Sequence, residues 1–124
     1  MFGGKPEYEM MNAMQYDAST LGNHDFDTGI EKLAGLQKIA LFPMINANYD
    51  LKDTPMKGLT VPHRVFEKDG IKVGVFGVGI DLKGLVNDSQ TGGLVYHDPI
   101  TLGNAAAAVL KNDLKCDLVV CLSH

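Results

Sequence analysis

The chain has 124 residues, of which 45% are hydrophobic and 21% are charged, a balance typical of one globular domain with a hydrophobic core. Its formal net charge of -4, with only 11 Lys and Arg scattered along the sequence, argues against a nucleic-acid groove, and no apolar run approaches the roughly 18 residues of a membrane span. The two cysteines, Cys116 and Cys121, are too few for a disulfide framework and are expected to be free thiols.

The first third of the chain predicts two helices separated by a short strand. Residues 5–15 are rich in helix formers, and three methionines at helical spacing are predicted to face the core: Met10, Met11 and Met14. A strand at 18–20 should lead into the polar stretch 21–27. The next helix is predicted to begin with Thr28 as its N-cap and Glu31 as the capping-box partner, with an inward face formed by Ile30, Leu33 and Ala34.

The remainder predicts a strand at 44–47, turns over 51–60, a hairpin, a loop over 80–97, a helix and a final strand. Asp69-Gly70 favours a hairpin turn, and the strand after it is apolar on both faces, which predicts burial between two layers. Asp98 and Pro99 predict the N-cap and first residue of a helix to about residue 115, before a short buried strand. This order predicts an α/β fold, layered with a mixed β-sheet.

The stretch LGNHDFDTG, residues 21–29, gathers two carboxylates, an amide and an imidazole at the predicted carboxyl end of a strand. In open α/β sheets the ligand crevice lies at that edge. These side chains suit ions such as Zn²⁺, Mn²⁺ or Fe, and two such ions can clamp a phosphoryl group. A purely structural turn is the simpler alternative, because Gly, Asn and Asp all favour turns.

Two features favour a functional site over a plain turn. His24 and Asp27 are three residues apart, so one turn of backbone can bring the imidazole to the carboxylate, which predicts a general acid with a fixed tautomer. His124 ends the final predicted strand and could share the same crevice. The other imidazoles, His63 and His97, are predicted to be structural. Three glycines lack the spacing of a dinucleotide-binding loop and instead predict close strand packing: Gly74, Gly77 and Gly79.

Residues 16–27, YDASTLGNHDFD, resemble the Asn-His signature block of the calcineurin-like metallophosphoesterases, in particular of their 5'-nucleotidase branch. The stretch FPMINAN at 42–48 resembles a second block of that branch, and 118–124 resembles the strand that delivers a further metal-binding histidine. Asn23 and His124 are 101 residues apart, about the separation in that branch. The resemblance implies a layered α/β metallophosphoesterase-type fold, incomplete, with residues 1–124 as part of the 5'-nucleotidase N-terminal type of domain.

The resemblance also implies a role for each matched residue. Asn23 and His124 would ligate the same one of two divalent metal ions, with Zn, Mn, Fe and Mg all open. His24 and Asp27 would form a catalytic dyad that contacts the phosphate and protonates the leaving oxygen, with Asp25 only in support. The implied reaction is metal-dependent hydrolysis of phosphate esters, most directly of 5'-nucleotides to nucleosides, by in-line attack without a covalent enzyme intermediate.

Three further motifs of the family are absent from these 124 residues: an Asp-x-His block, a Gly-Asp block and a Gly-His-x-His block. The chain is therefore expected to be part of a larger enzyme, with a nucleotide or other phosphomonoester and the remainder of its catalytic domain as partners. The alternative is a non-catalytic binding or regulatory module with the same fold. A thiol-based role is disfavoured, because the cysteines form no C-x-x-C motif. Relatives in this branch are often periplasmic or on the cell surface, whereas the sequence itself leaves the compartment open.

Overall fold

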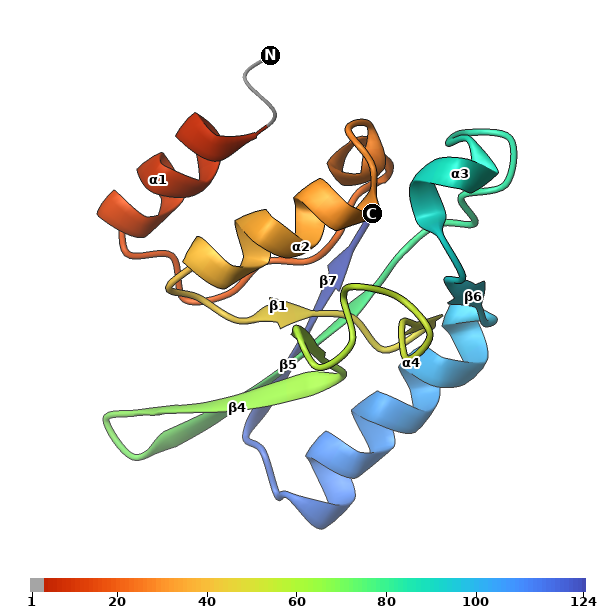
Figure 1. The fold of residues 1–124 in the computed structure, drawn as a ribbon. Coiled ribbons are helices and arrows are strands. Elements are labelled where there is room, and N and C mark those ends of the chain that lie inside the picture. The colour runs from red at the N-terminus through yellow and green to blue at the C-terminus, as the bar shows by residue number, and fades with distance from the viewer. Residues whose placement is uncertain (1–3) are drawn as a thin grey trace.

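A three-stranded mixed sheet spans the C-terminal half of the chain in the computed structural model, which describes residues 4–124 (Figure 1). Its central strand, β5 (Ile71–Val78), pairs antiparallel with β4 (His63–Lys68) and parallel with β7 (Leu118–Ser123). Asp69 and Gly70 have φ angles of 53° and 79°, the positive values that a type I′ hairpin turn requires. The predicted hairpin and the predicted mixed sheet are therefore confirmed.

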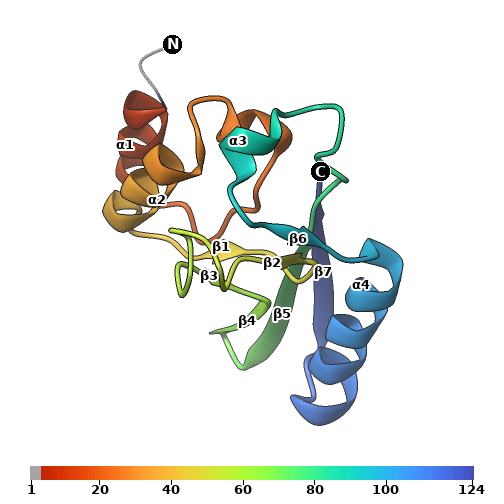
Figure 2. The same cartoon turned by 45° about the vertical axis from the view of Figure 1, so that its right-hand side comes forward.

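Two small sheets lie beside this one (Figure 2). β1 (Met44–Ile45) runs parallel to β3 (Thr60–Val61), and β2 (Tyr49–Asp50) runs antiparallel to β6 (Val95–Tyr96). The strand predicted at 18–20 is reduced to a single bridge between Ser19 and Met44.

Close backbone contact joins the sheets. The amide of Ala47 donates to the carbonyl of Gly77, at 2.7 Å. A Cβ built on Gly77 would lie only 2.1 Å from the carbonyl oxygen of Ile45, so this approach requires glycine. The predicted close strand packing around Gly77 is present.

The helices cover the sheets on two sides. α1 (Lys5–Ala13) lies against α2 (Ile30–Ile39), and α4 (Pro99–Ala108), which continues as a π-helical turn (Val109–Asp113), covers one face of the three-stranded sheet (Figure 1). The carboxylate of Asp98 accepts the backbone N–H of Thr101, so the predicted N-cap is confirmed.

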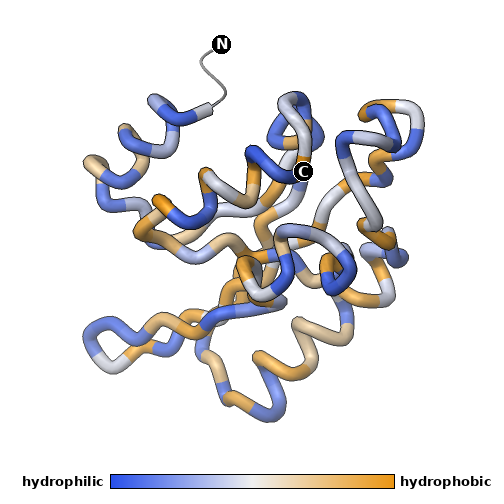
Figure 3. The backbone as a smooth tube through the Cα atoms, in the orientation of Figure 1, coloured by the Kyte–Doolittle hydropathy of each residue, from blue (hydrophilic) through white to orange (hydrophobic). Residues whose placement is uncertain are grey.

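Two apolar clusters form the core. The larger cluster packs against α1 and α2. Its completely buried side chains come from the polar loop, from α2 and from the 51–59 turns: Leu21, Phe26, Leu33 and Met56. The smaller joins α4 to β5 through Phe76, Ala106 and Leu110. Figure 3 shows hydrophobic residues along much of the strands and hydrophilic residues at the tip of the β4–β5 hairpin.

Several predictions about helix and strand packing are wrong. Met10 and Met14 are 61% and 58% exposed, because α1 turns Tyr8 inward and packs Met11 beside it. α2 begins after Gly29, whose φ of 94° turns the chain into the helix, so Thr28 is not its N-cap and no side chain caps this end. Ile30, Leu33 and Ala34 are buried as predicted.

The predicted loop at 80–97 contains a short helix, α3 (Asp88–Thr91), as well as β6. β7 is half exposed and not buried, since it lies at the edge of its sheet and pairs only with β5. Cys116 and Cys121 are free, as predicted. No helix in the range 4–124 has the length and apolar character needed to cross a membrane.

Candidate functional site

The polar loop is folded around a single 3-10 turn (Asn23–Phe26) that the sequence did not predict. Leu21 and Phe26 are completely buried and anchor the loop from below. The carboxylate of Asp25 accepts the backbone N–H of Gly22 at 2.7 Å and closes the turn. The intervening side chains of Asn23 and His24 are consequently held on the outer side of the loop.

His24 and Asp27 form the predicted pair. Nδ1 of His24 lies 2.9 Å from Oδ2 of Asp27. An ionised carboxylate only accepts hydrogen bonds, so Nδ1 carries the proton and Nε2 is left to face a ligand. The His24 side chain is 80% exposed and that of Asp27 is 51% exposed, so the imidazole is accessible from solvent.

The side chains of Asn23 and His124 are also in contact, although the two residues are 101 positions apart in the sequence. Nε2 of His124 lies 2.8 Å from the amide Oδ1 of Asn23. Figure 1 shows the C-terminal end of β7 beside the loop that precedes α2. Gly22 permits this approach, because a Cβ there would lie 3.1–3.3 Å from three atoms of the His124 ring. The backbone N–H of His124 is fixed by the carbonyl of Val78.

Asp25 faces inward from the same turn. Burial raises the pKa of its carboxyl above the usual range, while the hydrogen bond from Gly22 and the nearby imidazole of His124 act in the opposite direction. Burial, with the charge of Asp25 next in importance, also raises the pKa of Tyr8 on α1. The Tyr8 hydroxyl accepts a hydrogen bond from Gln37 at 2.5 Å. This hydrogen bond ties α1 to α2 beside the cavity that Tyr8 and Asp25 both line.

A cavity of about 390 Å³ opens beside the cluster. His24, Asp25, Asp27 and His124 line one side, and side chains of α1 and α2 line the other, among them Tyr8, Met11 and Leu36. Polar groups capable of proton transfer and ion binding thus border a space large enough for a small ligand.

Two buried amides and the two other imidazoles of the chain do not join this cavity. Asn46 and Asn48 are buried, and the Asn48 side chain bridges the backbone of Gly79 and the carbonyl of His97. The imidazole of His97 is exposed, and neither it nor His63 lines the cavity.

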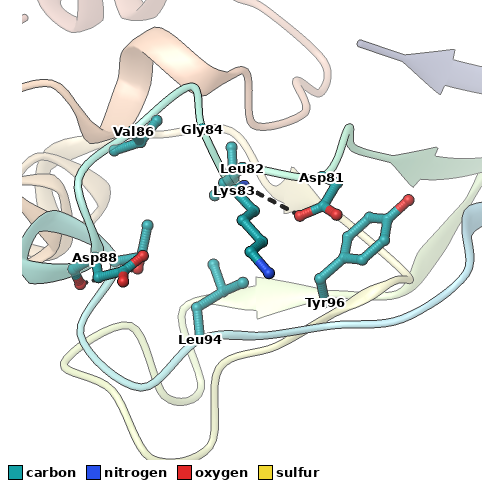
Figure 4. A pocket seen from close by; sticks show the side chains of 9 residues that line it. Asp81, Leu82, Lys83, Gly84, Val86, Asp88, Leu94 and Tyr96 are labelled. Atoms are coloured by element: carbon teal, nitrogen blue, oxygen red, sulfur yellow. Dashed lines mark hydrogen bonds between the residues drawn. The ribbon is translucent and has the colours of Figure 1, made fainter.

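A second cavity, of about 460 Å³, lies between β6 and the 81–88 loop (Figure 4). Figure 4 shows the Lys83 side chain reaching into it, with the backbone N–H of Lys83 donating to Asp81. None of the predicted site residues lines this space.

The donors fit part of a metal site. Ligand atoms of one ion at bond lengths of about 2.1 Å lie roughly 3 Å apart, close to the separation of the Asn23 and His124 donor atoms. An amide oxygen and an imidazole nitrogen suit the divalent ions named above. Within residues 4–124 no group of three or more His, Cys, Asp or Glu side chains is placed to hold an ion, so these two donors are only part of a complete ligand set.

Comparisons with known proteins agree with the resemblance seen in the motifs. The chain is 36% identical over 121 residues to a 5'-nucleotidase of Vibrio cholerae, a match that covers 97% of this chain and 22% of that protein. The crystal structure of a 5'-nucleotidase precursor from Thermus thermophilus superposes with a TM-score of 0.84 at 29% identity, covering 98% of this chain and 24% of that one. No family model matches the chain.

A calcineurin-like phosphoesterase from Bacillus subtilis, YfkN, superposes with a TM-score of 0.75 at 30% identity, over 96% of this chain and 38% of that one. The chain spans about a fifth of the length of the Vibrio relative. The resemblance to the 5'-nucleotidase branch and the layered α/β fold predicted from it are both confirmed.

Proposed function

We propose that this chain, whose sequence and fold match a segment of the 5'-nucleotidase type of calcineurin-like phosphoesterases, carries one side of an active site for metal-dependent hydrolysis of phosphate esters. The observation that carries the proposal is that His24, Asp27 and His124 line one cavity, where His24 pairs with Asp27 and His124 contacts the Asn23 amide. Nucleoside 5'-monophosphates are the proposed substrates, since the relative that covers this chain is a 5'-nucleotidase.

Asn23 and His124 would hold one of two divalent ions through Oδ1 and Nε2. When bound, such ions polarise the phosphoryl group and lower the pKa of a water molecule. The remaining ligands would come from parts of the polypeptide outside these 124 residues. Those parts of the catalytic domain are the proposed partner of this segment.

His24 would act on the leaving group. Asp27 holds Nδ1, so the imidazole presents Nε2 to the ester oxygen that departs as an alkoxide. In the imidazolium form Nε2 also carries a proton, and its transfer to the departing oxygen leaves a neutral imidazole that is still protonated at Nδ1. A positioned acid of this kind typically contributes about 10²–10⁴-fold to the rate. Asp25 has no contact with the substrate in this scheme and stabilises the turn through Gly22.

The test is hydrolysis of AMP and of p-nitrophenyl phosphate by the complete polypeptide that carries these residues, with Mn²⁺ or Zn²⁺ and after chelation. Turnover should require the metal and should fall in Asn23→Ala and His24→Ala. His97→Ala, which removes an exposed imidazole outside the cavity, is the control and should keep wild-type turnover. A complete polypeptide that binds no divalent ion would identify the fold as a non-catalytic module.

A further inference from the structure

The short helix α3 contacts the polar loop from outside the cavity. Nε2 of Gln90, on α3, donates a hydrogen bond to the backbone carbonyl oxygen of Asp27 at 2.5 Å. The two residues are 63 positions apart. Nothing in the sequence motifs points to Gln90, and it does not line the cavity that holds His24.

The Gln90 side chain is fixed at both ends of its amide. Its Oε1 accepts the backbone N–H of Asn87, the N-cap of α3, at 3.1 Å. At the other end of α3, a Cβ on Gly92 would lie 3.1 Å from the Ile30 side chain, so the helix is seated against the start of α2. Ile30 is buried, so the contact between the end of α3 and α2 is part of the hydrophobic core.

Asp27 depends on its backbone for its position. Its side chain is about half exposed, so packing does not hold the carboxylate against His24. The Asp27 backbone N–H donates to the His24 carbonyl at 3.2 Å, and its carbonyl accepts from Gln90. Its peptide groups are therefore held on both sides, which fixes the backbone position from which the carboxylate reaches His24.

We propose that Gln90 is a positioning residue that fixes the Asp27 backbone and thereby the orientation of the His24 imidazole. The catalytic consequence rests on the proposed function, whereas the structural coupling does not. A simpler role, capping of α3 through Asn87 alone, makes a different prediction, because the two hydrogen bonds use different atoms of the same amide.

Two variants separate these roles. Gln90→Glu keeps an oxygen that accepts from Asn87 but loses the N–H that donates to Asp27. Gln90→Met loses both hydrogen bonds at similar side-chain length. Ser89→Ala, on the same helix, is the matched control. Circular dichroism and the thermal midpoint of each variant verify that the fold is retained.

The first readout is the ¹⁵N spectrum of the His24 ring in this chain, in alkaline buffer where imidazoles are neutral. The wild type and Ser89→Ala should show the tautomer protonated at Nδ1. Gln90→Glu and Gln90→Met should both shift toward a mixture of tautomers. A wild-type signature in Gln90→Glu would assign Gln90 to capping alone and overturn the proposal.

The second readout is turnover of AMP by the complete polypeptide. Both Gln90 variants should lose on the order of 10-fold in kcat with KM little changed, because the dyad is misoriented while the binding groups remain, and misplacement of reacting groups is costly. If the Gln90 variants shift the tautomer but the complete polypeptide has no phosphatase activity, the coupling of Gln90 to His24 through Asp27 stands and the proposed function is rejected. An unchanged tautomer and unchanged kcat would reject the coupling alone.

Discussion

The imidazole Nε2 of His124 lies 2.8 Å from the amide oxygen of Asn23, across 101 residues of sequence. The contact needs the parallel pairing of β5 with β7, which carries His124 to the level of the loop, and the missing Cβ of Gly22. Backbone topology and one glycine thus bring together two donors that the proposed ion would share.

Removal of either donor should weaken metal binding by the complete polypeptide. Asn23→Ala and His124→Ala should each raise the Kd for Mn²⁺ by at least the 10- to 100-fold typical of losing a supporting residue at a metal site. Because both act on one ion, the double variant should lose less than the sum of the two losses in free energy. Titration calorimetry provides the measurement, and fully additive losses would argue for two separate ions.

Gly22→Ala should impair the proposed metal site with little effect on the fold. The φ and ψ of Gly22, -104° and 168°, are open to any residue, so the backbone is not strained. The new methyl group would instead press on the His124 ring and move it from Asn23. The expected result is weaker Mn²⁺ binding with a near wild-type thermal midpoint, and unchanged binding would contradict the account given for this contact.

His24→Ala should affect poor leaving groups most. AMP releases an alkoxide that needs a proton, and its kcat should fall by about 10²–10⁴-fold. p-Nitrophenyl phosphate releases a stable phenolate, so its kcat should fall far less. Steady-state kinetics on both substrates make the comparison, and equal losses would show that His24 does not protonate the leaving oxygen.

Gly77→Ala should destabilise the fold strongly. Its Cβ would meet the carbonyl of Ile45 at 2.1 Å, which neither backbone can accommodate without moving. Such overpacking costs about 1–3 kcal/mol or more in the free energy of unfolding, measurable by urea denaturation. Gly35→Ala on α2 is the control: nothing lies within 4 Å, and the substitution should stabilise the helix by roughly 0.5–1 kcal/mol.

The cap of α4 should make stability depend on pH. Hydrogen bonds from the side chain and backbone of Thr101 hold the pKa of Asp98 below its ordinary value of 3.8. A lowered pKa contributes stability above pH 3.8 that is lost as pH falls through the folded-state value. The difference in unfolding free energy between wild type and Asp98→Ala should therefore shrink with acidification, whereas Asp98→Asn, which cannot ionise, should lack that contribution throughout.

Local signals in the sequence predicted the hairpin and α4 because Asp69-Gly70 and Asp98-Pro99 specify their own backbone geometry. The same reasoning missed α3, since four residues are too few for a periodic pattern. The N-cap was assigned to Thr28, whereas α2 begins after Gly29, whose φ of 94° is one that glycine adopts most readily. Burial also depends on which neighbours are present, so the exposure of Met10 and of β7 could not be deduced from hydrophobicity alone.

The sequence predicts which residue types form the candidate site, but it predicts only some of the contacts between them. The three-residue spacing of His24 and Asp27 predicts their contact directly. The meeting of Asn23 with His124 depends on strand order, which the family resemblance implied and periodicity could not. Gln90 carries no sequence signal, because its contact with Asp27 is made to a backbone carbonyl, a group that every residue possesses.

Because β7 pairs parallel with β5 and ends at His124, a cation bound there would also stabilise the fold. An ion bound by both Asn23 and His124 would act as a reversible cross-link between residues 101 positions apart. For comparison, a permanent cross-link that closes a loop of about 100 residues stabilises the fold by about 4.7 kcal/mol in the chain-entropy model. Chelation should then loosen the edge strand first, and hydrogen exchange along β7 would record the loss of that tether.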